Sequence, residues 1–104
     1  MADAYKTIYQ GQLPSTVAVL ATVGASKSWI LKHYSIRNIT AGAVTYELFK
    51  NGTTGDYSWD KGEVPANGKV EWDGTEGFAT GETIAGVAGA ATSLTLTISG
   101  DEVT

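Results

Sequence analysis

Apolar and polar residues alternate with a period of two in short runs along the chain. In residues 93–99, Leu94, Leu96 and Ile98 share one face, while serines and threonines occupy the other. Successive side chains of a β-strand point to opposite faces of a sheet, so this run predicts a half-buried antiparallel strand. Residues 43–50 and 17–23 repeat the alternation, and both faces of the second run are fairly apolar. No run has the convincing apolar stripe of an amphipathic helix.

The composition supports the same conclusion. Of the 104 residues, 28 are Thr, Val or Ile, and only 7 are Leu or Met. β-branched side chains lose rotamer freedom in helices and fit well on a pleated sheet. Turn dipeptides separate the runs, and these are Asn51-Gly52, Asn67-Gly68 and Asp73-Gly74, with Thr80-Gly81 and Ser99-Gly100 as weaker signals. The sequence therefore predicts seven to eight short strands.

We predict an all-β fold, a two-layer antiparallel β-sandwich of jelly-roll or immunoglobulin-like type, with an open barrel as the main competitor. A chain of 10.9 kDa fits a single domain over residues 1–104. Residues 1–10 are expected to form an arm or an added edge strand. The alternation slips within residues 28–40, and a β-bulge near Lys32 or His33 would reconcile its two halves.

Charge and hydropathy exclude several classes of partner. The formal net charge is -4 and the sequence pI is about 4.7, which argues against binding nucleic acid through its phosphates. No apolar run approaches the roughly 18 residues of a membrane span. The first ten residues lack the order of a signal peptide, so we expect a protein made in a cytoplasm. There is no cysteine, which excludes disulfides and cysteine-ligated zinc.

Signatures of catalysis are absent from the sequence. His33 is the one histidine, and any Ser-His-Asp arrangement would have to be built around it. No nucleophile elbow, phosphate-binding loop or dinucleotide-binding turn is present. The carboxylate pairs Asp56 with Asp60 and Asp73 with Glu76 lack the dense spacing of a calcium loop. We therefore expect no enzymatic activity, no cofactor and no metal site.

Aromatic residues outside the strand pattern are the candidate partner contacts. Tyr57 and Trp59 stand among charged residues in the segment 52–65, where aromatics often make binding contacts. The alternative for Trp59 is that it folds back and caps the core. Phe49 has the wrong parity for its strand, which makes it a rim residue or a partner contact. The candidate partner-binding residues are Tyr5, Ile8, Tyr9, Phe49, Asp56, Tyr57 and Trp59.

The two halves of the chain differ in charge. Residues 1–54 carry a balance of +3 and residues 55–104 a balance of -7. Interleaved strands would average this difference out within one molecule. Alternatively, one rim is basic and another acidic, so that copies dock to one another in a ring.

Three stretches and the tail together resemble small virion structural proteins of tailed bacteriophages. The stretches are YKTIYQGQLPSTVAVLATVGASKSWILKHYSIRN (5–38), AVTYELFKNGT (43–53), VPANGKVEWDGTEGFATGETIAG (64–86) and the closing LTLTISGDEV (94–103). They resemble an opening strand, a paired strand and a long strand ending at an Asn, then a strand with its turn, then a P-A-G-G-x-x-E-W-D-G type segment. This sequence departs from the pattern at Glu82, where the pattern has Asp, and at Phe78, where it has an aliphatic residue. It also departs in the aromatic-acidic loop from Asp56 to Glu63.

The resemblance implies a β-sandwich virion component, a class that includes head-decoration (cement) proteins and domains attached to tails or fibres. A cement protein would bind the major capsid protein or another virion protein across subunit junctions and stabilise the head. The expected location is the virion, and the preferred oligomer is a homotrimer by analogy. The alternative is a tail- or fibre-associated module that binds host-surface carbohydrate by stacking it on Tyr57 and Trp59.

Overall fold

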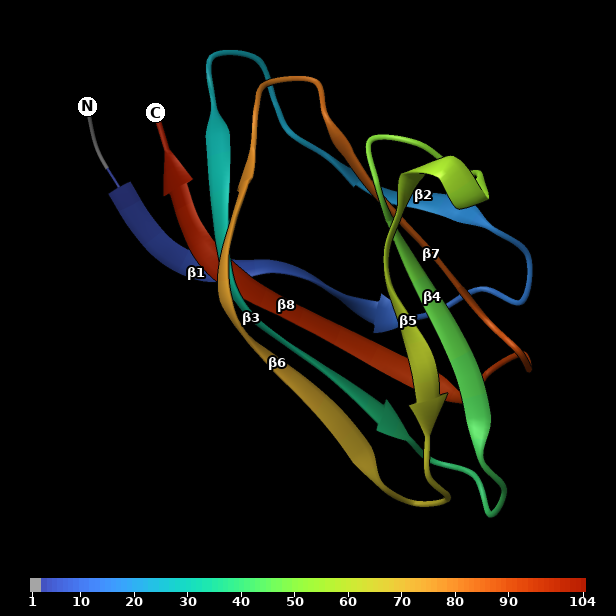
Figure 1. Ribbon diagram of the computed structural model, residues 1–104. Coiled ribbons are helices and arrows are strands. Elements are labelled where there is room, and N and C mark those ends of the chain that lie inside the picture. The colour runs from blue at the N-terminus through green and yellow to red at the C-terminus, as the bar shows by residue number, and fades with distance from the viewer. Residues whose placement is uncertain (1–2) are drawn as a thin grey trace.

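The computed structural model describes residues 3–104, which form eight strands and one short 3-10 helix (Figure 1). The strands are β1 (Asp3–Gln12), β2 (Ala18–Thr22), β3 (Ser28–Asn38), β4 (Val44–Lys50), β5 (Ser58–Val64), β6 (Lys69–Phe78), β7 (Thr83–Ala88) and β8 (Leu94–Val103), and the helix is η1 (Gly55–Tyr57). Within the described range, no helix has the length and apolarity of a membrane span. The all-β class and the upper strand number predicted from the sequence are confirmed.

The strands form two four-stranded antiparallel sheets. Sheet I has the order β1-β8-β3-β6, and sheet II has the order β2-β7-β4-β5. In this arrangement β1 pairs with β8, β2 with β7, β3 with β6 and β4 with β5, as in one long hairpin rolled into a sandwich. This is the jelly-roll alternative of the prediction, because an immunoglobulin domain distributes its strands differently.

Residues 3–12 form an edge strand and not an arm. β1 pairs with β8 from Asp3 to Gln12, and its register shifts between Thr7 and Tyr9. Residues 1 and 2 of the predicted arm lie outside the described range. The first strand therefore belongs to sheet I, and its outer edge has no partner strand among the residues that the structure describes.

The predicted alternation sets which side chains fill the space between the sheets. Leu94, Leu96 and Ile98 of β8 are fully buried. On β3, Leu31 pairs with Gly100 and His33 with Ser99, so Lys32 is an extra residue in the strand. The bulge predicted near Lys32 or His33 is therefore confirmed. It restores alternation, because Leu31, Tyr34 and Ile36 all reach the core.

Three predicted turns are correct, namely Asn51-Gly52, Asn67-Gly68 and Thr80-Gly81, which lie between strands. Two others are wrong. Asn51 and Asn67 have φ values of 58° and 54°, the left-handed conformation that Asn tolerates. Asp73-Gly74 and Ser99-Gly100 instead lie inside β6 and β8. A Cβ on Gly74 would lie 2.7 Å from the Trp72 ring. These glycines therefore serve close packing within strands and do not form turns.

Ion pairs inside the molecule join the basic half of the chain to the acidic half. Glu102 of β8 lies 3.4 Å from Lys6 and 3.5 Å from Lys27, and it accepts a hydrogen bond from Trp29 Nε1 at 2.9 Å. Lys50 Nζ lies 2.7 Å from Glu76 across the sandwich. These ion pairs support the first of the two predicted alternatives, in which interleaved strands average the charges out within one molecule. The rolled hairpin places basic strands beside acidic ones.

We predict that Gly100→Ala destabilises the fold strongly. An added Cβ would lie 2.3 Å from the Ile30 carbonyl oxygen and 2.8 Å from the Leu31 Cα, and backbone atoms of a central strand cannot move aside cheaply. The expected loss in the free energy of unfolding is about 3 kcal/mol, measured by urea denaturation. Gly77→Ala is the matched control, since its Cβ would meet no atom within 4 Å. Equal stability of the two variants would contradict this packing.

Candidate functional site

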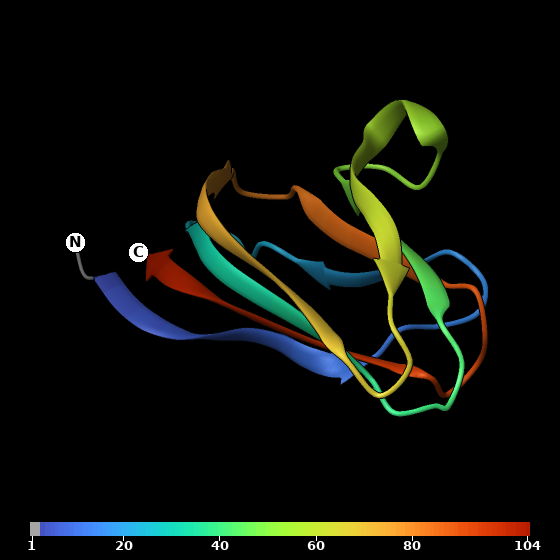
Figure 2. The same cartoon turned by 60° about the horizontal axis from the view of Figure 1, so that its bottom comes forward.

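Three of the predicted contact residues project from the surface. Tyr5 on β1 is 66% exposed and Tyr57 at the end of η1 is 50% exposed. Asp56, also in η1, is exposed. η1 belongs to the loop between β4 and β5, which projects beyond the body of the two sheets (Figure 2). Tyr5 and the η1 residues therefore do not form one continuous surface, because β1 belongs to sheet I and η1 lies in a loop that joins two strands of sheet II.

Ile8 and Tyr9 are only partly available for contact. Both are partly buried and pack against the core cluster. The Tyr9 hydroxyl lies over Gly11, where an added Cβ would be 2.7 Å away. The two residues line the β1 edge of the sandwich, and each keeps part of its side chain at the surface.

Phe49 requires a correction, because it is 3% exposed and cannot act as a rim residue. The prediction that Phe49 lies on the strand face opposite the core was correct, because its neighbour Leu48 belongs to the core cluster and Phe49 does not. Phe49 pairs with Ala85 on one side and Ser58 on the other. η1 contacts β4, and we attribute the burial of Phe49 to this loop. The structure thus buries a residue that the sequence analysis placed at the rim or in a partner contact.

Trp59 caps the core, which was the second of its two predicted roles. The β4–β5 register shifts between Leu48 and Phe49, whose partners are Asp60 and Ser58, so Trp59 is the extra residue of a bulge. Its ring lies 5.4 Å from Trp72 and 5.8 Å from both Tyr34 and Phe78, in edge-on geometry. A carbohydrate platform made of Tyr57 and Trp59 is therefore not present, because the two rings occupy different environments.

A polar network lies beside this aromatic cluster. The Tyr34 hydroxyl donates a hydrogen bond to Asp60 Oδ2, and the Tyr46 hydroxyl interacts with Tyr34. Burial raises the pKa of Tyr34 far above its ordinary value, and the contacts with Asp60 and Tyr46 act in the same direction. Burial also raises the pKa of Tyr46. The network joins β3 of sheet I to β4 and β5 of sheet II, so it holds the two layers together at this end.

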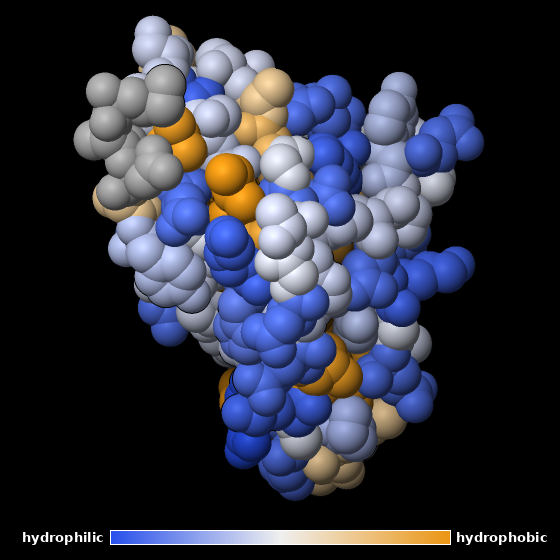
Figure 3. All heavy atoms as spheres, turned by 60° about the vertical axis from the view of Figure 1, so that its left-hand side comes forward, coloured by the Kyte–Doolittle hydropathy of each residue, from blue (hydrophilic) through white to orange (hydrophobic). Residues whose placement is uncertain are grey.

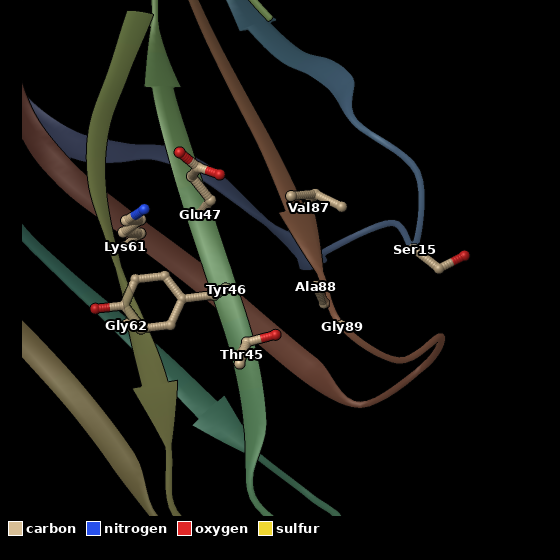
Figure 4. Close-up of a pocket in the computed structure, with 9 residues that line it drawn as sticks. All are labelled: Ser15, Thr45, Tyr46, Glu47, Lys61, Gly62, Val87, Ala88 and Gly89. Atoms are coloured by element: carbon tan, nitrogen blue, oxygen red, sulfur yellow. The ribbon is translucent and has the colours of Figure 1, made fainter. Parts of the chain in front are cut away.

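A hollowed surface lies on the outer face of sheet II. It is an open depression of about 650 Å³ (Figure 4). Its lining residues are Ser15, Thr45, Tyr46, Glu47, Lys61, Gly62, Val87, Ala88 and Gly89. Glu47 and Lys61 face each other across β4 and β5, yet no ion pair within the described residues joins them. Sequence reasoning missed this surface because the facing of these residues depends on the β4–β5 register.

His33 lies in a charged cluster on the outer face of sheet I. Its Nδ1 lies 2.8 Å from Asp73 Oδ1, and its Nε2 lies 3.5 Å from Glu71 Oε2. Ser99 and Asp73 face His33 on the neighbouring strands β8 and β6. A catalytic triad would turn the second ring nitrogen to the serine, within a cleft. Here that nitrogen faces Glu71, and the Asp73 side chain is 85% exposed. The cluster therefore has the form of a surface ion-pair network.

The carboxylates that were weighed as metal ligands have other partners. Asp60 accepts from Tyr34, Asp73 contacts His33, and Glu76 pairs with Lys50. Across residues 3–104, no three His, Asp or Glu side chains gather closely enough to hold a metal ion. On the side of the molecule that lies to the left in Figure 1, hydrophobic atoms form only small separate spots (Figure 3).

We predict that alkaline pH destabilises the protein through Tyr34. Its folded pKa lies above the unfolded value near 10, so its stabilising contribution is complete below about pH 10 and is lost as the pH rises further. Tyr34→Phe should make the fall in unfolding free energy above pH 10 shallower. At pH 7 it should cost about 1–3 kcal/mol, because Asp60 loses a donor. Tyr57→Phe, at an exposed phenol, is the control, and identical pH profiles for Tyr34→Phe and the wild type would contradict the assignment.

Comparisons with known proteins support the fold and leave the function open. No protein-family model matches the chain, and no curated protein sequence matches it. One matching structure comes from work on Bacillus endospore appendages, which form a family of disulfide-linked pili. The match has a TM-score of 0.53 and 18% sequence identity, and it covers 99% of this chain and 87% of that chain. An infectious bursal disease virus structure, Gx strain, matches at TM-score 0.38 and 15% identity over 96% of this chain and 31% of the viral chain.

At this identity, the likeness to the appendage protein shows a shared fold. That fold is the antiparallel two-sheet sandwich of eight strands seen here. The phage origin expected from the sequence stays a prediction. The chain is thus a small β-sandwich protein that resembles, in fold, a protein of a pilus-like bacterial appendage.

Proposed function

We propose that the protein is a non-enzymatic structural subunit that associates with copies of itself within a larger assembly. The observation that carries this proposal is the contrast between interior and surface. Among the described residues, no buried side-chain nitrogen or oxygen lacks a hydrogen-bond partner, so the polar groups of the interior are already paired. The surface meanwhile presents Tyr5 and Tyr57. Exposed tyrosines bury large areas at interfaces with little entropy loss, which suits contact between subunits.

The finer proposal is a capsid decoration (cement) protein of a tailed bacteriophage. It would bind across junctions of the major capsid protein after synthesis in the host cytoplasm, and it would stabilise the head by burying area between subunits. The sequence resemblance supports this role. A rigid two-sheet body with exposed strand edges is also what such a role requires. Electron microscopy of the particle tests it, since density for this chain on the head supports it and density on the tail contradicts it.

The self-association is tested by light scattering coupled to size-exclusion chromatography over a range of concentrations. We expect a discrete oligomer, with the homotrimer as the state predicted by analogy. A strict monomer at the highest concentration reached would contradict the proposal of self-association. Tyr5→Ser should lower the oligomer fraction if β1 contributes to the contact, and Thr53→Ser in the β4–β5 loop serves as a mild control.

A carbohydrate-binding module is the second candidate, favoured by the depression on sheet II. Thr45 and Ser15 supply hydroxyl groups, and Glu47 and Lys61 supply charges that can bond to sugar hydroxyls. We expect, on this alternative, a glycan-array signal that Glu47→Gln lowers at least about tenfold. Glu63→Gln on the adjacent strand, outside the lining, should retain the signal. An array without any signal removes the alternative.

A further inference from the structure

The four unpaired strand edges of the sandwich differ sharply in charge. β1 and β6 are the edges of sheet I, and β2 and β5 are the edges of sheet II. Charged residues occur on three of them: Asp3 and Lys6 on β1; Asp60, Lys61 and Glu63 on β5; Lys69, Glu71, Asp73 and Glu76 on β6. β2 carries none, and residues 13–26 contain no Asp, Glu, Lys, Arg or His. β2 is therefore the uncharged edge among these four.

β2 also exposes apolar side chains. Its sequence is AVLAT, and Val19 at its centre is 50% exposed. Val19 pairs with Ala85, on the face opposite the core residues. Leu20 and Ala21 are only partly buried against the core. Proteins usually protect an edge strand with charges, proline or a covering segment, because its free backbone groups can pair with another chain.

The opposite side of the sandwich is protected. There, β5 and β6 carry the charges named above, and Trp59 packs edge-on against Trp72 and Phe78 to bridge the sheets. Lys50 adds an ion pair to Glu76 of β6. The molecule thus has one charged, braced side and one uncharged edge with exposed valine and alanine.

We propose that β2 pairs antiparallel with β2 of a second copy, which joins two copies of sheet II into one continuous sheet. This inference rests on the self-association part of the proposed function and adds β2 as a contact surface separate from Tyr5 and Tyr57. The charges of the edge strands indicate which strand pairs with β2. Facing side chains on paired strands lie about 4.5–5.5 Å apart, so a β1, β5 or β6 edge would place lysines or carboxylates against valine and alanine. Only a second β2 brings an uncharged edge of the same kind.

The symmetry of this contact has a direct consequence. Pairing a strand with its own copy in antiparallel orientation creates a twofold axis, and the contact closes after two copies. The axis runs through the sheet, so the outer faces of both copies lie on the same side. Val19 from each copy then lies on that shared face close to the junction. The state that this contact forms alone is a dimer, and the trimer predicted by analogy requires a different surface.

The first experiment compares Val19→Lys with Thr75→Lys. Both place a lysine at an exposed position of an edge strand, the first on β2 and the second on β6. Because the twofold axis brings two copies of the new lysine near each other, Val19→Lys should weaken the dimer at least about tenfold in sedimentation equilibrium. Thr75→Lys should leave the dimer unchanged. Unfolding curves of both variants show whether either change acts through stability.

The second experiment uses the absence of cysteine from the chain. Single cysteines replace the exposed β2 residues Ala18, Val19 and Thr22 in separate variants, with Thr7→Cys on β1 and Thr75→Cys on β6 as controls. In a glutathione redox buffer, at least one β2 variant should form a disulfide-linked homodimer, since facing positions of paired strands meet the distance that a disulfide needs. The two controls should stay monomeric on a non-reducing gel.

The outcomes separate this inference from the proposed function. A dimer that Val19→Lys dissociates and a β2 cysteine links supports the pairing. An oligomer of any size that keeps its mass in Val19→Lys, or whose β2 cysteines do not link, overturns the pairing and leaves self-association standing. A monomer in every experiment overturns both.

Discussion

The pairing of each strand in the first half of the chain with a strand in the second half is the constraint on which this molecule depends. β4 and β5 form the innermost pair, and β1 and β8 form the outermost. Rolling this long hairpin also brings β3 beside β8 and β4 beside β7. The basic half of the chain therefore meets the acidic half inside one molecule, and charges that look segregated in the sequence become neighbours.

Local sequence determines the strands, but it does not determine their neighbours. The alternation of Leu94, Leu96 and Ile98 and the slipped alternation around Lys32 were sufficient to predict a strand and a bulge, because both depend on residues close in sequence. The choice of the jelly-roll order over the immunoglobulin order was left open, since it depends on contacts between distant strands. Glycines inside β6 and β8 were mistaken for turn residues for the same reason. Glycine is needed at these positions because another strand or an aromatic ring approaches the backbone closely.

The candidate contact residues show the same division. Tyr5 and Tyr57 were correctly expected to lie at the surface, because aromatic side chains in polar surroundings have no local partner. Trp59 and Phe49 could not be placed from sequence. A bulge turns Trp59 into the core, and Phe49 is buried on a strand whose loop returns to contact it. The depression beside Glu47 and Lys61 was also invisible, since it exists only once β4 and β5 are in register.

The position of β8 has a consequence for how the protein is made. β8 is the last strand along the chain, yet it lies between β1 and β3 at the centre of sheet I. Until a ribosome has released residues 94–103, β1 has no neighbour and β3 lacks one of its two. Sheet I therefore cannot be completed until residues 94–103 have left the ribosome, and its folding depends on contacts of very long sequence separation, which form slowly. Premature termination ahead of β8 would leave β1 without the strand that joins it to β3, so sheet I of such a fragment could not form in its native order.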